Sequence, residues 1–598
     1  MIRFIKHITV IFYLIYSFDG FSQVFYTTDT AYFQKISETY FLKDTTKNSR
    51  TFTDTSVFNF HNNLPFYFSG QSGMMQPNYL LNVKNNSLGF KPWDFYIPDF
   101  IDENSIDIFK TKNIFAKLEG IAGSKEEQHF RAFITSPIKK YSQVNFYFRR
   151  SVSKGFYQFQ QSSVSNLMCS YHFFGKKKLS MDAMLILNGV KYQENGGIIN
   201  DSLNAQEMIL DKSLVNINLN SAKKNIRDEQ LKWNIYYKII ENNHHKEYIS
   251  TSVSVTRNIF KYSDDNPKNG YYPFVFLDTI KTRDSLNVLS LQGKVGYHIQ
   301  FNKMYNELNY NYQYSKIYFH YDTSVINHVV QWKNSYTFQF KIPLQYSINA
   351  QYIVAGTQSG NYIADADILS KYNKFTFHFG AHSCIKSPTF NQNFWYANNY
   401  IWYNHFVNIF QNGLNFSINY KDKISVAYIL NQYKNFIFYD SYAYPMQYQN
   451  YLDVHQINLN YHDILLRHIG IDLNYYYQQK NIDIILFPEH FVKSSLYYTG
   501  RIFQKNLLLQ TGFQFVTSSL FAAYQYMPAT GVYYIPNVNK AVGNYPQLNF
   551  FLSGRIKPVN FFIRVDNILA GIQPYYFIPH YMMPDMSIRM GISWMFFD

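Results

Sequence analysis

The chain has 598 residues, of which 20% are aromatic and only 16% charged, and its formal net charge is +15. Mean hydropathy is −0.28 although 46% of residues are hydrophobic, and no apolar run of 18 or more residues follows the first two dozen. This excludes a bundle of transmembrane helices. A transmembrane β-barrel fits, because its lipid-facing and lumen-facing residues average out along each strand.

The first 22 residues predict a secretory signal peptide. A basic start at 3–7 precedes an apolar stretch at 8–18, and a small-x-small site ends at Ser22, which places cleavage before Gln23. The apolar stretch is too short to span a membrane and no stop signal follows it. We therefore expect an exported protein. A buried first strand is the alternative for this stretch.

Residues 23–112 differ from the rest of the chain. The stretch 27–54 is polar and rich in turn residues, and 58–98 is aromatic but interrupted by Gly and Pro. Such punctuation favours loops over regular strands. We expect an N-terminal segment that lies in the periplasm or faces a lumen.

From residue 113 onward, apolar and polar residues alternate. In "NELNYNYQYS", 306–315, Leu308 and Tyr310 share one parity, and Asn309 and Asn311 share the other. A period of two indicates a β-strand, and an aromatic face opposite an amide face fits lipid on one side and water or plug side chains on the other. The predicted strands, an even count of 22, cover residues 113–119, 129–135, 143–149, 164–174, 179–188, 229–240, 248–257, 288–301, 305–319, 334–342, 344–354, 361–369, 374–382, 413–420, 424–431, 452–461, 468–477, 493–502, 507–515, 547–556, 559–567 and 585–597.

The connections between these strands separate by length. Short turns such as 175–178 and 302–304 all fall on one side, and long segments such as 190–228, 383–413 and 516–546 all fall on the other. Outer-membrane barrels have short periplasmic turns and long extracellular loops. The predicted fold is all-β: a single large antiparallel transmembrane β-barrel over 113–598, with about 22 strands in a range of 16–22. A lectin-like sandwich would not account for the sided loops.

The last predicted strand has a second feature. Ile592, Trp594 and Phe596 share its apolar parity, and Phe597 is next to last. An amphipathic final strand with a terminal aromatic resembles the signal that the outer-membrane insertion machinery recognises. The alternative is an ordinary closing strand of a soluble sheet.

Four segments of the N-terminal third occur in a characteristic order. The chain resembles the large Gram-negative family of putative porins, in which a signal peptide and a short N-terminal segment precede one barrel. This resemblance implies a porin-like barrel in the outer membrane and no particular substrate. The segments are "LGFKPWDFYIPDF" (88–100), "GSKEEQHFRAFIT" (123–135), "KGFYQFQQSSVSN" (154–166) and "QENGGIIND" (193–201).

Motifs of enzymes are absent from the sequence. There is no P-loop, no G-x-S-x-G, no H-E-x-x-H and no CxxC. His244 and His245 lack the further ligands that a metal site needs. We therefore expect no enzyme, no catalytic residue, no metal and no cofactor. Two cysteines in so long an exported chain, Cys169 and Cys384, predict free thiols.

Counting parity inward from each aromatic face assigns basic residues to the lumen. Fewer acidic residues share that parity, and a basic lumen would favour anions. The alternative is that a lysine-rich composition reflects an AT-rich genome, with much of the charge in turns. No basic helix supports nucleic-acid binding. The predicted lumen-lining residues are Arg131, Arg149, Lys232, Lys238, Lys294, Lys341, Arg564 and Arg589, and the acids are Asp182, Asp365, Asp472 and Asp566.

Three functions are compatible with this sequence. The first is a porin for passive or weakly selective diffusion of small hydrophilic solutes, with a preference for anions. The second is a gated or plugged barrel for nutrient uptake, and the third is a structural, adhesive or secretion-associated barrel, suggested by long aromatic loops such as 393–406. The expected partners are outer-membrane lipid and lipopolysaccharide, the insertion machinery and the solutes. The oligomeric state stays open.

Overall fold

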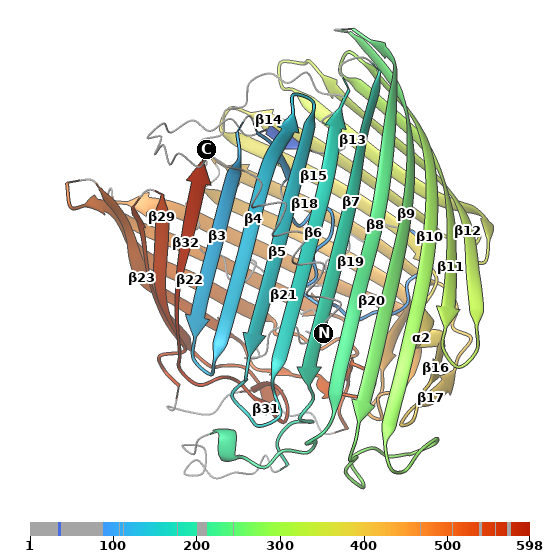
Figure 1. The fold of residues 1–598 in the computed structure, drawn as a ribbon, viewed down its shortest axis with the longest axis vertical. Helices are drawn as coiled ribbons and strands as arrows, with labels where there is room; N and C mark the ends of the chain where they lie inside the picture. Colours follow the sequence, from blue (N-terminus) through green and yellow to red (C-terminus); the bar gives the residue numbers. More distant parts are fainter. Residues whose placement is uncertain are drawn as a thin grey trace.

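The computed structural model describes residues 34–36, 88–106, 108–111, 113–175, 178–199, 212–242, 244–421, 423–466, 468–504, 506–537, 541–556, 558–570 and 576–597. The predicted signal peptide, 1–22, lies outside these residues. The wall is a closed antiparallel barrel of 22 strands, which confirms the predicted fold class (Figure 1).

Consecutive barrel strands pair with each other, and the first pairs with the last, β3 with β32. The barrel strands are β3 (Phe115–Gly123), β4 (Glu127–Lys139), β5 (Ser142–Ser153), β6 (Ser162–Phe174), β7 (Leu179–Gln193), β8 (Lys223–Glu241), β9 (His245–Asp264), β10 (Thr282–Phe301), β11 (Met304–Tyr318), β12 (Thr323–Phe338), β13 (Leu344–Gly356), β14 (Tyr362–Tyr372), β15 (Phe375–Lys386), β18 (Ile409–Tyr420), β19 (Ile424–Tyr439), β20 (Pro445–Leu465), β21 (Ile469–Lys480), β22 (His490–Ile502), β23 (Leu507–Ser518), β28 (Gln547–Ile556), β29 (Val559–Asp566) and β32 (Ser587–Phe597).

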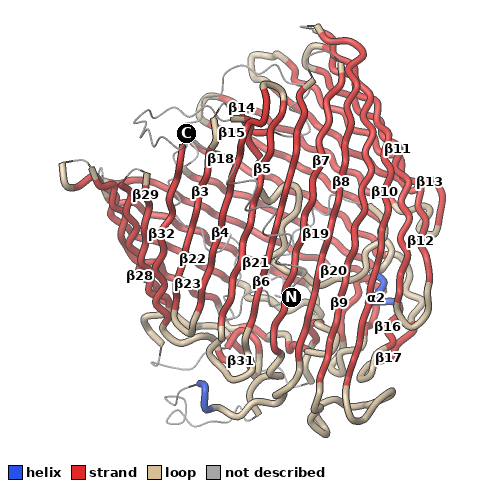
Figure 2. The backbone as a smooth tube through the Cα atoms, viewed as in Figure 1, coloured by secondary structure: helices blue, strands red, loops and turns tan. Residues whose placement is uncertain are grey.

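Short elements lie outside the wall. Figure 2 shows helix only as small pieces beside the strands, and among the described residues no helix is long and apolar enough to cross a membrane. The short strands pair as β1 with β2, β16 with β17, β24 with β27, β25 with β26, and β30 with β31. These elements are β1 (Gln34–Ile36), β2 (Ile108–Lys110), η3 (Lys212–Leu214), α2 (Phe390–Asn393), β16 (Phe394–Tyr396), β17 (Ile401–Tyr403), β24 (Phe521–Ala522), β25 (Gln525–Met527), β26 (Val532–Tyr534), β27 (Ala541–Val542), β30 (Tyr576–Ile578) and β31 (Tyr581–Met582).

The alternation in β11 separates the two faces of the wall. Leu308 is 55% exposed on the outer face, whereas Asn309 is 1% exposed on the inner face. Backbone hydrogen bonds run from strand to strand around the ring, so that the polar main chain is satisfied where it crosses lipid. The exposed side chain of Leu308 therefore costs no free energy of hydration, because in a membrane the outer face meets hydrocarbon and not water.

Each predicted strand corresponds to one strand of the wall, but many strands extend further at the long-loop end. β8 begins at Lys223 where the sequence predicts 229, and β20 has 21 residues. At about 3.4 Å per residue, β20 is far longer than a hydrocarbon core of about 30 Å needs, even when tilted. In the extension of β8 the apolar parity is reversed, because Ile226 is buried on the inner face, whereas Leu231 and Trp233 further along the strand are exposed on the outer face. One boundary is wrong in the other direction: β12 ends at Phe338, and Lys341 lies in the following turn.

The loops confirm the predicted sidedness. Short turns such as 140–141, 302–303 and 373–374 share one mouth of the barrel, and the connections 194–222 and 519–546 share the other. Figure 1 shows the end of β32 at the first mouth and β16, β17 and β31 at the second.

The final strand presents its apolar parity outward. Ile592, Trp594 and Phe596 are exposed on the outer face of β32, and Trp594 stacks on Phe596 with ring centroids 5.2 Å apart. Phe597 is the last residue of β32, and its side chain lies outside what the structure describes. The proposed recognition by the insertion machinery stays a prediction.

Cysteine labelling tests which mouth faces the medium. Ile280, in the connection 265–281 between β9 and β10, is 77% exposed, and Leu466, in the short turn after β20, is 83% exposed. We expect a membrane-impermeant maleimide to label Ile280→Cys on intact cells and Leu466→Cys only after the outer membrane is breached. Both variants are made in a protein in which the two free cysteines, Cys169 and Cys384, are replaced by serine. Labelling in the reverse order would invert the topology.

Candidate functional site

Residues 88–106, here called the strap, lie inside the ring of strands. Leu88 packs against inward side chains of β12, β13, β14 and β15. Further along, Asp99 pairs with Arg149 on β5, and Glu103 pairs with Lys232 on β8 at 2.5 Å. Because β5 and β15 stand on nearly opposite sides of the ring, the strap crosses the lumen. Figure 1 shows it as a blue coil between the front and back walls.

The middle of the strap is fixed by a buried carboxyl group. Asp94 accepts hydrogen bonds from Asn391 Nδ2 at 2.8 Å, Gln392 Nε2 at 3.0 Å and the Tyr439 hydroxyl at 3.1 Å. Burial raises the pKa of Asp94, and these donors lower it in part. Asn391 and Gln392 belong to a long extracellular connection, so Asp94 fastens the strap to the loops above it.

The long extracellular connections fold inward and pack on the strap. We call their buried part, drawn from 194–199, 212–222, 265–281, 387–408 and 519–537, the cap. Its apolar core contains Tyr272, Tyr400, Trp402 and Tyr526 and continues onto Trp93, Phe95 and Ile97 of the strap. Packed aromatic side chains exclude water and hold a single arrangement. The cap and the strap therefore form one body across the extracellular half of the lumen.

A buried ion pair joins the cap to the wall. Lys224 Nζ at the start of β8 lies 2.7 Å from Glu194 Oε1, and the side chains are 0% and 2% exposed. Tyr526 accepts from Lys224 and donates to Glu194, both at 2.6 Å. Burial raises the pKa of Glu194, and the ammonium group of Lys224 opposes that rise. The pair ties strand β8, the connection after β7 and the connection after β23 to one point.

Seven of the eight predicted lumen cations face acidic partners. Glu119, Glu127 and Glu307 lie on inward parity, so the sequence count of inward acids was too low, and Asp99 and Glu103 come from the strap. Lys341 lies exposed in a turn. The pairs are Arg131 with Glu119, Arg149 with Asp99, Lys232 with Glu103, Lys238 with Glu241, Lys294 with Glu307, Arg564 with Asp566, and Arg589 with Glu127 and Asp566.

A polar cavity of about 270 Å³ opens on the lumen face of β8 to β12, and Lys232 and Lys294 line it. Tyr305, another lining residue, follows the short turn 302–303, so the cavity lies in the periplasmic half of the lumen. Glu103 of the strap borders it. The remaining lining residues are Gln230, Asn234, Tyr236, Tyr248, Ser250, Thr251, Ser252, Ser254, Gln292, His298, Glu307, Asn311 and Lys333.

Small residues make room for this cavity. Serines at 250, 252 and 254 form one inward row on β9, and Gly296 follows on β10. A Cβ at Gly296 would stand 2.2 Å from Asn309 Oδ1 and 2.7 Å from Ser250 Oγ, so a larger residue would have to displace these side chains. His298 stacks on Tyr248 with ring centroids 4.0 Å apart, which fixes an aromatic wall beside the serines.

The charged side chains of the cavity differ in exposure: the carboxylate is buried, and the lysines beside it are partly exposed. Glu307 is 5% exposed and accepts from the Tyr305 hydroxyl at 2.6 Å and from Asn309. Lys333 and Lys294 approach the same carboxylate at 3.3 and 3.7 Å and are 32% and 28% exposed. One buried carboxylate thus serves two more exposed ammonium groups.

Most residues of this site were not predicted from the sequence, and for three of them the reason can be given. Glu307 lies on the inward parity of 306–315 and could have been found by listing acids as well as bases. Lys333 falls one residue before the predicted strand 334–342. Glu103 lies in the strap, where no periodic pattern exists that could assign its direction.

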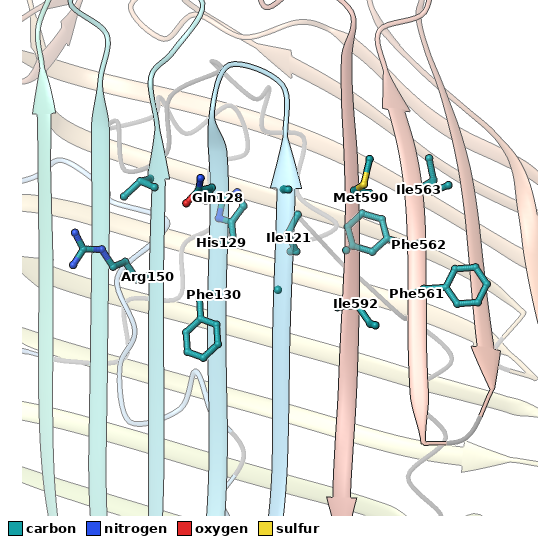
Figure 3. Close-up of a pocket in the computed structure, with 14 residues that line it drawn as sticks. Ile121, Gln128, His129, Phe130, Arg150, Phe561, Phe562, Ile563, Met590 and Ile592 are labelled. Carbon is teal, nitrogen blue, oxygen red and sulfur yellow. The ribbon is translucent and has the colours of Figure 1, made fainter. Parts of the chain in front are cut away.

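A second hollow of about 730 Å³ lies at the seam where β3 meets β32. Figure 3 shows the side chains around it, which come from β5, β4, β3, β32 and β29. Phe130, Met590 and Ile592 are exposed on the outer face there, and a Cβ at Gly120 would meet no atom within 4 Å. This hollow faces lipid and does not lie on a path through the lumen.

Comparisons with known proteins agree on the architecture. Residues 25–598 match the family described as "Putative porin". No curated protein matches the sequence.

Within the described residues, no group of three or more His, Cys, Asp and Glu side chains could hold a metal ion.

Solved structures share the fold at low sequence identity. The FrpB iron transporter of Neisseria meningitidis (F3-3 variant) is 11% identical, with a TM-score of 0.57 over 81% of this chain and 82% of that chain. The ferric enterobactin receptor PfeA of Pseudomonas aeruginosa is 11% identical, with a TM-score of 0.58 over 82% of each chain. The copper transporter OprC is 9% identical, with a TM-score of 0.58 over 81% and 80%. At these identities the likeness shows the fold alone.

Proposed function

This chain belongs to the putative porin family, and we propose that it is a gated uptake barrel of the outer membrane, in which a hydrophilic solute crosses only when the strap and the cap move. One observation carries the proposal: the strap crosses the lumen and packs with the cap into one apolar core. A solute that enters from outside meets this body before it reaches the polar cavity beneath.

Passive diffusion, the first function suggested by the sequence, receives less support. It needs an aqueous path beside the strap and the cap, whose aromatic side chains are buried against each other. The preference for anions relied on basic residues that outnumber acidic ones in the lumen, and most of the predicted cations face carboxylates. The similar solved structures are named as an iron transporter, a copper transporter and a ferric enterobactin receptor, which favours uptake over diffusion for this fold.

The adhesive alternative depended on long aromatic loops. In the connection 387–408, Trp395, Tyr400 and Trp402 are buried in the cap core. An aromatic side chain that packs inward offers nothing to an outside partner. Closure of the lumen accounts for these three aromatic residues, whereas Tyr403 of the same connection is 69% exposed.

A conductance measurement tests the proposal. We expect the purified full-length barrel, inserted into a planar bilayer, to give no steady conductance steps in 1 M KCl. A passive porin would give regular steps under the same conditions. Heat-modifiable migration on gels checks that the inserted protein is folded. Steady, voltage-independent steps from the full chain would overturn the proposal that the barrel is gated.

A further inference from the structure

We propose that lipopolysaccharide binds, through its phosphorylated head, to the outer face of β7, β8 and β9 near the mouth that carries the long loops. The four cations of this site, here called the basic patch, are Lys191, Lys223, Arg227 and Lys261. The inference goes beyond uptake and does not depend on gating. It requires that the long loops lie outside the cell, which the cysteine labelling tests separately.

The four cations surround one residue of β8, Asn225. Lys191 of β7 and Lys261 of β9 pair with Asn225 from its two sides, and directly paired residues share a face of the sheet. Lys223 and Arg227 lie two residues before and after Asn225, so they share that face as well. Neighbouring strands are about 4.8 Å apart, and residues two apart in one strand are separated by about 6.8 Å. Long side chains from all four positions can therefore reach one phosphorylated head. Figure 1 shows β7, β8 and β9 side by side in the wall.

The basic patch lies on the outer face, just beyond the apolar surface that meets lipid. Leu231 and Trp233, further along β8 on the parity of Arg227, are each 54% exposed, whereas Ile226 is buried on the inner face. Acyl chains cover apolar rows of this kind in a membrane, so the head groups lie near the level of the patch. The row of directly paired residues through β7, β8, β9 and β10 is Leu185, Leu231, Val255 and Leu291.

Positive charge is in excess at the basic patch. Among the described residues, none of its four cations forms an ion pair. Two carboxylates lie near it. Glu229 is two residues from Arg227 and stands opposite an arginine of β9, and Asp265 pairs with Arg283 and also attracts Lys223. Each of these acids thus faces a further arginine outside the patch, so they do not neutralise its four cations.

Extension of a strand beyond the membrane does not by itself require cations. β19 and β20 also extend at the long-loop mouth. Residues 445–452 of β20 contain no charged side chain, and Lys434 is the one charged residue of 434–439 in β19. Amides and aromatic residues meet water there. The cations around Asn225 therefore indicate an anionic ligand.

Lipopolysaccharide matches both parts of this surface. Its lipid A carries two phosphate groups on one head above several acyl chains. The phosphates can accept charge-assisted hydrogen bonds from the basic patch, while the acyl chains cover the apolar row beside it. A phospholipid offers a single phosphate and fewer chains, so four neighbouring cations fit lipid A better.

Lipid A and its dephosphorylated form are a matched pair of probes, because they share acyl chains and differ in the two phosphates. The purified full-length protein, in neutral detergent at low salt, is loaded with fluorescent lipid A, and its anisotropy is followed during competition. We expect unlabelled lipid A to compete at concentrations about tenfold or more below those of the dephosphorylated form. Raising the salt should weaken lipid A binding, since the patch is exposed to water.

Variants locate the effect. Arg227→Gln with Lys261→Gln should weaken lipid A binding about tenfold or more, because cations near an anionic lipid head each add to the attraction. Lys303→Gln with Lys434→Gln removes the same charge from exposed positions outside the patch and should bind lipid A as the parent does. Arg227→Lys with Lys261→Arg keeps both charges and should retain most of the affinity, which separates loss of charge from misfolding.

Three results would overturn the proposal. The first is equal competition by lipid A and its dephosphorylated form in the folded parent, and the second is unchanged lipid A binding in the Gln double variant. The third is competition by phosphatidylglycerol as strong as that by lipid A, which would show a surface for any anionic lipid. All three would leave the gated barrel standing, and steady conductance of the full chain would leave the lipid binding intact.

Discussion

Deleting residues 88–106 is expected to turn a silent barrel into a conducting one. The strap is anchored to both sides of the ring, through Leu88 on one side and Asp99 on the other. It also supplies Trp93, Phe95 and Ile97 to the cap core. Its loss removes material from the lumen and support from beneath the cap. Planar-bilayer recording should show conductance at least roughly tenfold above that of the full chain.

A matched variant controls for the length of the deletion. Replacing 88–106 by glycine and serine in equal number keeps the chain length but removes the anchors, and it should also conduct. Heat-modifiable migration must be unchanged in both variants. If both stay silent although they are folded and inserted, the cap closes the lumen without the strap, and the strap is not the gate.

Breaking the buried pair by Lys224→Met is expected to loosen the cap strongly. The substitution leaves Glu194 buried without its cation, and removal of one partner of a buried pair costs about 3–5 kcal/mol. A local opening equilibrium in the cap should rise about a hundredfold or more. Hydrogen exchange of the amides of β25, which carries Tyr526, and of its partner strand β26 measures this directly.

The double variant distinguishes the pair from simple loss of packing. Lys224→Met with Glu194→Gln removes both charges and should recover much of the protection. Lys268→Met is the control, because Lys268 is an exposed cap lysine that donates to Asn218, and surface substitutions usually cost under about 0.5 kcal/mol. Equal exchange in the single variant and the parent would show that the ion pair does not hold the cap.

The strands could be predicted because each one separates two solvents. In β11 the aromatic parity meets lipid and the amide parity meets the lumen, so a period of two is visible without any knowledge of neighbours. The strand ends could not, because in the extension of β8 the apolar side chain of Ile226 packs inward in the cap core, and the outward apolar parity is lost. Lys341 was assigned to a strand for the opposite reason, because the alternation continues past Phe338, the last residue of β12.

In the candidate site, too, the direction of a side chain could be predicted from local pattern, and its partner could not. Parity alone pointed Lys232 and Lys294 inward, because direction within a strand is a local property. Which carboxylate each lysine meets depends on register between strands and on a segment without periodicity, as with Lys294 and Glu307, or Lys232 and Glu103.

The residue pattern was enough to specify the barrel and the separation of its short turns from its long loops, since alternation and loop length act residue by residue. What fills the lumen was settled by the folded arrangement. The strap and the cap are held by contacts between residues far apart in the chain, such as Asp94 with Asn391 and Glu194 with Tyr526. Such contacts follow from closure of the ring, which brings distant loops over one mouth and leaves no trace in local pattern.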